Sequence, residues 1–486
     1  MKWILILGVF LLSGCLVGPN YHPPSTAMSD NWNGECPAIC STQQPAPVAW
    51  WKIFCDPLLD GYIEKAAFFN QDILQAEARI VQARAIRQMT ASALFPQIAA
   101  DLNVTRTYFS KNGPAFFFST GAANGISSST TGLPFQIQIP RIQNLYTALI
   151  DVSWEIDIFG KTRRAVEAAC AQIGEAVATR NDILISVLAE VARNYMELRG
   201  AQRRGQLIEE YLTILEKTRD ISSSRLKSGY INRLDLDRVE AEYAQAKAQL
   251  PEVHAQIYQN IYALSVLIGT LPETLLCELL PIQSLPSIPH CVDIGLRSDL
   301  LRRRPDIRVE ERKLAAATAN IGVAVASFFP TFTFSGDIGL QSLSLRRLFQ
   351  GRSLTWAVGG DISVPIYQGG NLIGNLRLAE AKAVEAFFSY QEVVLSALQE
   401  AETALVAYTQ ELKTADALEE AVQKYEQLVK LTRSRNTKGL VAFTDVLDIE
   451  RQWNTSSQNL LTSQISALVD IIKLYKALGG GWEPCD

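Results

Sequence analysis

The chain has 486 residues and a formal net charge of −5. This near balance of charge argues against a nucleic-acid-binding protein, which would carry a strongly basic surface. The length would allow two or three ordinary domains, but the only clear break in composition is the proline-bearing stretch from Pro272 to Pro289.

The N-terminus has the form of an export signal. Lys2 precedes an apolar run from Trp3 to Leu12, which is too short to span a bilayer. The run ends in Leu-Ser-Gly-Cys, which resembles the cleavage site of a bacterial lipoprotein. That resemblance implies a signal peptide over residues 1–14, a lipid on Cys15, and sorting to the outer membrane because Leu16 rather than Asp follows. An ordinary signal with a coincidental cysteine is the alternative.

Two halves of the chain repeat one order of features: helix, strand, loop, strand, very long helix, turn, helix. Phe95-Pro96 returns as Phe329-Pro330, and Lys227-Ser228-Gly229 returns as Thr437-Lys438-Gly439. Such duplication indicates a pseudo-symmetric wall rather than a pocket. We therefore expect an extended, lipidated segment at 15–60, repeats at 61–271 and 300–479, a linker at 272–299 and a tail at 480–486.

Four segments alternate between apolar and polar residues with the period of a β-strand. In the first repeat the apolar face runs through Ile98, Ala100, Leu102 and Val104, and then through Tyr146, Ala148, Ile150, Val152, Trp154, Ile156 and Ile158. In the second it runs through Phe332, Phe334, Ile338 and Leu340, and then through Leu354, Trp356, Val358, Ile362, Val364 and Ile366.

A soluble sandwich would explain one such strand equally well. Two hairpins behind an export signal favour strands that cross a bilayer, with the polar face lining a lumen. A membrane barrel needs at least about eight strands, because open edges in lipid leave backbone groups unpaired. Four strands per chain therefore predict an oligomer, with extracellular loops at 110–143 and 342–353.

Two segments predict helices too long for a compact domain. No proline occurs between Lys161 and Ser228 or between Asn371 and Asn436, and apolar residues recur there at helical spacing. A helix of that length extends about 100 Å. Antiparallel partner helices are expected at 232–268 and 445–478, the first kinked at Pro251, and shorter helices at 61–93 and 300–327.

The residues offer little for catalysis. His22, His254 and His290 stand apart, and His290 beside Cys291 cannot close a metal site alone. The glycine cluster at Gly369, Gly370 and Gly374 follows a strand but is too weak to indicate a phosphate loop. We expect no enzyme, no cofactor and no metal site.

Seven cysteines remain besides Cys15. An exported chain can form disulfides, so Cys36 with Cys40 and Cys277 with Cys291 are possible staples, while the odd number leaves at least one thiol unpaired. Cys170 lies in a helical apolar stripe, and we expect it to be buried.

The chain resembles the TolC-like outer-membrane factors. Among them it is similar to the NodT- and OprM-like lipoprotein branch, which serves resistance-nodulation-division efflux systems. The matching stretches are residues 15–21 (CLVGPNY), Trp50-Trp51 with Asp56-Pro57, 157–161 (DIFGK), 301–307 (LRRRPDI), 364–370 (VPIYQGG) and 478–482 (LGGGW). The resemblance implies an α+β membrane protein. In it, a long helical barrel joins a transmembrane β-barrel that three chains complete with four strands each, above a periplasmic adaptor and an inner-membrane pump.

Two sets of residues are candidate sites. Asp445 and Asp448 share one helix face and match the aperture motif of the family, and in a trimer they would ring the narrow end, with Arg451 nearby. An ordinary pair that complements the helix dipole is the alternative. Some relatives lock the aperture with a tyrosine and an arginine, where this chain has Asn436 and Val441; Arg451 or Arg233 could replace them. The second set comprises the residues of the two turns: Lys227, Ser228, Gly229, Thr437, Lys438 and Gly439. An adaptor would bind there, or these residues have a purely structural role in the turns.

The function implied is an outer-membrane efflux channel for small molecules. A duct for type I protein secretion or for heavy-metal efflux, a passive porin and a surface adhesin are the alternatives. The long helices disfavour a porin, which needs only short periplasmic turns. The sequence specifies neither the cargo nor the pump.

Overall fold

A computed structural model describes residues 16–24, 32, 39–41, 47–110, 141–289 and 292–482. The chain forms two compact units, and each unit takes segments from both halves of the sequence. The first comprises the described residues of Met1–Tyr21, Ala85–Cys170 and Ala316–Ala383. The second comprises those of His22–Arg84, Ala171–Ala315 and Val384–Asp486. Cys15, Cys36 of the expected Cys36–Cys40 staple, Cys291 and most of the expected loop at 110–143 lie outside the described residues.

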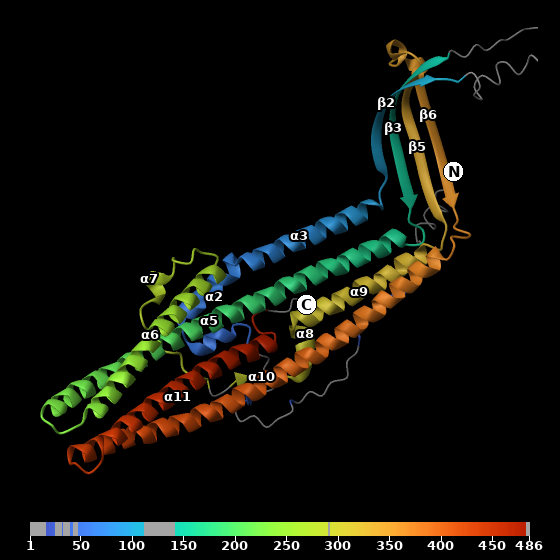
Figure 1. The fold of residues 1–486 in the computed structure, drawn as a ribbon. Coiled ribbons are helices and arrows are strands. Elements are labelled where there is room, and N and C mark those ends of the chain that lie inside the picture. Colours follow the sequence, from blue (N-terminus) through green and yellow to red (C-terminus); the bar gives the residue numbers. More distant parts are fainter. Residues whose placement is uncertain are drawn as a thin grey trace, which may run out of the picture. The chain divides into compact units, whose positions relative to one another are not determined.

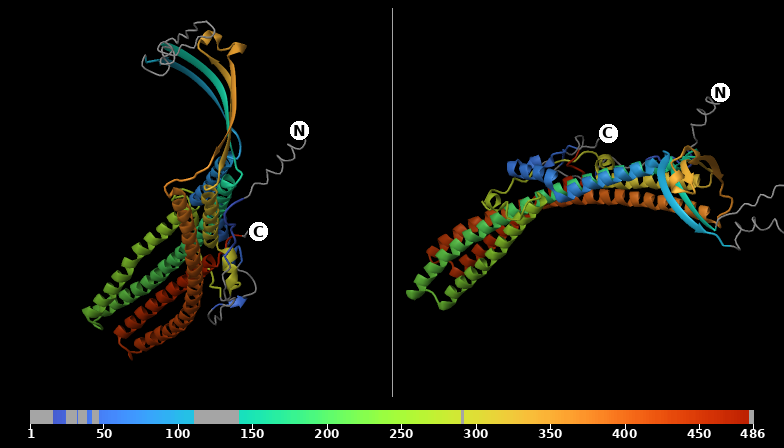
Figure 2. Two further views of the ribbon diagram at one scale, coloured as in Figure 1. Left: turned by 90° about the vertical axis from the view of Figure 1, so that its right-hand side faces the viewer. Right: turned by 90° about the horizontal axis from the view of Figure 1, so that it is seen from above.

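The first unit holds one four-stranded antiparallel sheet in the order β2-β3-β5-β6. Its strands are β2 (Gln97–Tyr108), β3 (Ile142–Ile156), β5 (Thr331–Ser342) and β6 (Leu354–Ser363). Figure 2 shows them bending together as one curved sheet. The last strand ends earlier than expected, before Val364 and Ile366, because Pro365 has no backbone N–H to donate.

The register places the even-numbered residues of all four strands on one face. Ile98 pairs with Val152, Ile150 with Ile338, and Ile338 with Trp356, so the apolar residues lie side by side across the sheet. This face is exposed in the single chain: Leu102 is 86% and Trp356 69% accessible. The alternation expected from the sequence is therefore confirmed, and the sheet leaves an unusually large apolar surface uncovered.

Helices dominate the rest of the chain. Two of them are very long, α5 (Lys161–Lys227) and α10 (Asn371–Thr437), with 67 residues each. Each turns back into a 35-residue partner, α6 (Arg233–Leu267) or α11 (Phe443–Ala477). Figure 1 shows each long helix beside its partner as a hairpin. Helix α6 continues through Pro251. Among the described residues, none of the helices combines the length and the hydropathy of a membrane-spanning helix.

The shorter helices differ from the expected ones because each is split. The first forms α2 (Pro57–Phe69) and α3 (Gln71–Ser92), because Asn70 leaves the helical conformation and its side chain caps α3 by accepting from Asp72 N. The second forms α8 (Leu300–Arg303) and α9 (Pro305–Ala326), since Pro305 cannot continue the hydrogen-bond ladder. Asn70 also donates to Leu267 O at 2.8 Å.

The second unit contains the main hydrophobic core. Trp50, in a 3-10 turn (Trp50–Phe54), stacks on Tyr475 of α11, and Tyr62 of α2 lies against Tyr195 of α5. A short parallel pair, β1 (Ile39–Ser41) with β4 (Val292–Asp293), and the small helix α7 (Leu276–Leu279) belong to the same unit.

Cys170 is exposed, and our expectation that it is buried is wrong: its neighbours Ala168 and Ala169 face the interior instead.

Candidate functional site

The two helical hairpins end in turns of the same construction. After α5, Gly229 adopts a left-handed φ of 76°, and Tyr230 N donates to Arg225 O at 2.9 Å. After α10, Gly439 adopts a φ of 71°, and Leu440 N donates to Arg435 O at 3.0 Å. Both turns are glycine-terminated helix ends, in which only glycine takes the left-handed position without strain.

The expected turn residues lie at the exposed ends of these hairpins. A groove of about 770 Å³ runs between the two turns. Its lining includes Ser228 from the first turn and Thr437 and Gly439 from the second. A β-carbon built on Gly229 or Gly439 would meet no atom within 4 Å, so the surface there is open to a partner.

The expected aperture residues begin the return helix α11. Asp445 lies in its first turn, and Arg451 approaches Asp448 at 3.6 Å, with both side chains largely exposed. Arg233 pairs with Asp237 at 2.8 Å within α6. Both arginines considered as a lock therefore form ion pairs within their own helices.

Asn436 and Val441 also meet, but as part of the turn. The Asn436 side-chain amide donates to Val441 O at 3.0 Å. This bond closes the turn between α10 and α11, and it gives the asparagine a local structural role.

Sequence reasoning missed an ion pair within the second hairpin whose carboxylate is buried and whose arginine is exposed. Glu450 of α11 is 3% exposed, and Arg433 Nε of α10 donates to its Oε1 at 2.7 Å. Its other carboxylate oxygen, Oε2, is buried without a hydrogen-bond partner. The signal was present in the sequence, because Glu450 follows Val446 by four residues and so falls on the buried stripe of α11.

The LRRRPDI stretch contributes a buried cation, Arg304. Arg304 forms a bidentate pair with Asp306 through Nε at 3.0 Å and Nη2 at 2.6 Å. Its Nη2 also reaches Glu400 of α10 at 2.8 Å, and Nη1 donates to Ala477 O at 3.1 Å. Burial alone would lower the pKa of Arg304, but Asp306 and Glu400 outweigh it and raise that pKa. Arg304 thus links the start of α9 to the middle of α10 and to the end of α11.

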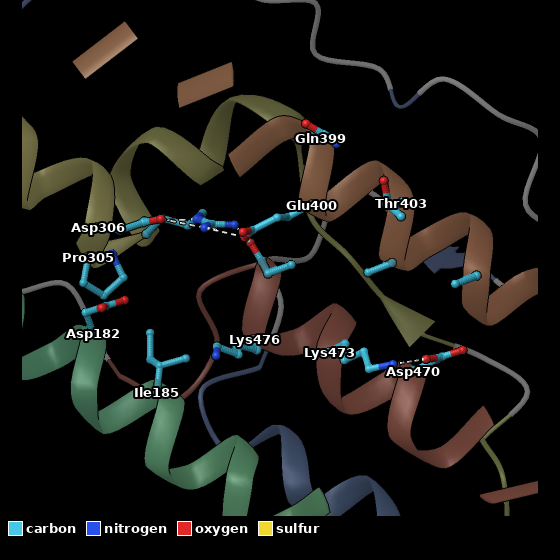
Figure 3. A pocket seen from close by; sticks show the side chains of 14 residues that line it. Asp182, Ile185, Pro305, Asp306, Gln399, Glu400, Thr403, Asp470, Lys473 and Lys476 are labelled. Carbon is cyan, nitrogen blue, oxygen red and sulfur yellow. Dashed lines mark hydrogen bonds and ion pairs between the residues drawn. The ribbon is translucent and has the colours of Figure 1, made fainter. Parts of the chain in front are cut away.

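A cavity of about 440 Å³ adjoins this arginine (Figure 3). Asp182 of α5 lines it, and Arg304, Asp306, Glu400 and Lys476 line the same cavity. Burial is the main cause that raises the pKa of Asp182, and Asp306 adds to it, while Lys476 and Arg304 oppose the shift. Among the described residues, no group of three or more His, Cys, Asp or Glu side chains could hold a metal ion.

Comparison with known proteins gives the family. The family model for outer membrane efflux proteins matches residues 62–270 and 296–480. The chain belongs to the outer membrane efflux protein family. Its members and structural neighbours are channels rather than enzymes, and the chain is an outer-membrane efflux channel component.

The similarity extends over nearly the whole chain. Nodulation protein T of Rhizobium leguminosarum bv. trifolii is 28% identical, with 98% of this chain and 96% of that protein covered. The toluene efflux pump outer membrane protein TtgF of Pseudomonas putida is 30% identical, with 97% and 95% covered. The solved structure of the outer-membrane channel OprN superposes with a TM-score of 0.83 at 29% identity, covering 96% of this chain and 100% of that one. The predicted resemblance is confirmed.

Proposed function

We propose that three copies of this efflux protein assemble into one duct, with their sheets closing a single transmembrane β-barrel. The sheet itself carries this proposal. In the described part of the chain, β2 pairs only with β3 and β6 only with β5, so both outer edges lack a partner strand. In a bilayer, the backbone groups at these edges have no water to bind and must pair with another strand. Other copies of the chain offer the matching edges.

The proposal includes an internal repeat that forms a helical barrel below the membrane. Corresponding elements have equal lengths: 67 residues in α5 and α10, 35 in α6 and α11, and 22 in α3 and α9. The family model also matches the chain in two stretches. Both observations support the repeats at 61–271 and 300–479.

The cargo is proposed to be small molecules delivered by a periplasmic adaptor and an inner-membrane transporter. TtgF is named for toluene, a small apolar compound, and the similarity to it supports cargo of this class. The groove between the turns at Lys227–Gly229 and Thr437–Gly439 is the proposed adaptor contact. A lipid on Cys15 would hold the start of the chain in the outer membrane, since one acyl chain adds about 0.8 kcal/mol per buried methylene to a second anchor.

The gate is proposed at Asp445 and Asp448, with Arg451 balancing part of their charge. Three copies would bring their carboxylates together at the narrow end, where a negative ring favours cations. The exposure of these side chains and the 3.6 Å approach of Arg451 to Asp448 support this assignment.

Planar-bilayer conductance of the purified protein tests the gate. Replacing both Asp445 and Asp448 with alanine should raise the conductance and weaken block by multivalent cations, because the ring loses its charge and bulk. The control is Asp235→Ala, which removes the first-turn acid of α6, the matching helix in the other hairpin. Unchanged conductance and block in the double variant would remove the gate assignment.

The mass of the detergent-extracted particle tests the assembly separately. Native mass spectrometry should give three chains per particle, because only a closed ring leaves no strand edge unpaired. A stable monomer that forms no pore would refute the duct.

A further inference from the structure

One buried arginine in the first unit binds the residues that follow Cys15. Arg164 lies in the first turn of α5 and is 1% exposed. Its Nε donates to Val17 O at 3.1 Å, and its Nη2 donates to Gly18 O at 3.1 Å and to Asn20 Oδ1 at 2.8 Å. The remaining nitrogen, Nη1, pairs with Glu167 at 2.7 Å. Most of these contacts therefore go to the N-terminal segment.

Backbone contacts complete this arrangement. Val17 N donates to Phe159 O at 3.3 Å, just after strand β3. Gly18 has a φ of 89°, and a β-carbon there would lie 2.5 Å from the Gly322 Cα of α9. A β-carbon on Gly322 would in turn lie 2.8 Å from Arg164 Cδ. The two glycines thus let the segment, α9 and the arginine side chain come into close contact.

The helix itself gives no reason for a buried cation here. The positive end of the helix dipole disfavours basic residues in the first turn, and α5 has no acidic residue there to offset them. A buried guanidinium also needs hydrogen-bond acceptors to replace water. Glu167 is one such acceptor, and the carbonyls of Val17 and Gly18 and the Asn20 side chain are the others.

We propose that Arg164, Gly322 and Phe159 O form an intramolecular binding site for residues 16–20, which holds the start of the mature chain at the junction of strands and helices. Leu16 packs against Gly160, the residue before α5, so the bound segment ends one residue from Cys15. The identity of the anchor on Cys15 rests on the function proposed above. The binding of residues 16–20 does not.

Limited proteolysis of the purified full chain in detergent tests the site. Brief chymotrypsin treatment can cut after Tyr21, and mass spectrometry then reports loss of the N-terminal fragment. Arg164→Ala should speed this cleavage by about tenfold or more, because the segment detaches more often. Gly322→Ala should do the same by pushing the arginine side chain out of place, although alanine favours the helix.

Two matched variants control for charge and for helical glycine. Lys161→Ala removes an exposed cation from the same turn, and Gly374→Ala fills open space in α10 of the same unit. Both should be cut at the wild-type rate. If Arg164→Ala fails to fold, Asn20→Ala removes one acceptor without touching a helix and should still speed cleavage.

Wild-type cleavage rates in Arg164→Ala, Gly322→Ala and Asn20→Ala would overturn the proposed binding site. The mass of the N-terminal fragment reports separately whether Cys15 carries a lipid. Failure of lipidation or of pore formation would thus be distinguishable from failure of the segment to bind.

Discussion

Asp182 illustrates how one half-buried carboxyl makes stability depend on pH. Its pKa is raised chiefly by burial and further by Asp306. A raised pKa in the folded state means that the folded chain binds the proton more tightly than the unfolded chain. The stability contributed by Asp182 therefore falls as the pH rises from 3.8, the ordinary aspartate pKa, through the higher pKa of the folded chain. It stays low at neutral pH.

Replacing Asp182 with asparagine should remove this destabilisation. We expect the melting temperature of Asp182→Asn to exceed that of the wild type at pH 7.5, and the difference to vanish well below the usual aspartate pKa. Asp470→Asn serves as control, because that residue lines the same cavity but pairs with Lys473 at 2.9 Å. Equal melting temperatures at pH 7.5 would contradict the account.

The Arg433 and Glu450 pair leads to a second prediction at this scale. Arg433→Met leaves a carboxylate that is 3% exposed without its partner, which should cost about 1–3 kcal/mol of unfolding free energy. Adding Glu450→Gln should restore part of that loss, since the neutral amide has less need of a cation. Urea titration of the single and double variants measures the coupling, and additive losses would argue against it.

Much of this residue-level detail could not be read from the sequence. The turn glycines and the aspartates of α11 stand out by motif. Some partners of Arg304, Arg164 and Glu450 lie on other segments, and these do not, because only the fold brings them near. The burial of Cys170 was misjudged for a related reason. Helical spacing predicts which residues share a face, but a rotation of the helix by one residue leaves those at the edge of that face exposed.

At the scale of elements, the pairing of two strands depends on glycines at the positions where their backbones come too close for a side chain. A β-carbon on Gly339 of β5 would lie 2.0 Å from Ala148 O of β3, whereas one on Gly360 of β6 would meet nothing within 4 Å. Both glycines lie in the same sheet, one where two backbones come close and one in open space.

Gly339→Ala should therefore separate β3 from β5 and cost about 3 kcal/mol or more, because the nearby atom is backbone and cannot rotate away. Gly360→Ala should leave stability near the wild type. Thermal unfolding of the two variants in detergent makes the comparison, and equal melting temperatures would show that the sheet is not paired in this register.

Element type and length followed closely from periodicity, and element ends did not. The long helices were predicted to within a few residues because no proline interrupts them. The breaks at Asn70 and Arg304 were missed, since a capping asparagine looks like any helix-surface residue until its partner Leu267 is known.

For the whole molecule, the proposed duct assigns the apolar face of the sheet to lipid. Leu102→Lys places a charge on that face and should cost about 2–4 kcal/mol near the middle of the bilayer. Asn103→Lys, one residue along, places the same charge on the polar face and should cost little. The yield of assembled protein in outer-membrane fractions compares the two, and a loss confined to Asn103→Lys would reverse the assignment of the faces.

In the part of the chain that the structure describes, the outer edges of β2 and β6 have no partner strand, and this also bears on how the proposed duct is made. In the proposed assembly, a new copy would meet its neighbours only by collision, so the stability of the duct would depend on the local concentration of chains. Until then, each copy presents a ready template for unwanted strand addition. Slow synthesis should thus leave more material as unassembled, protease-sensitive chains, and crowding at the membrane should rescue it.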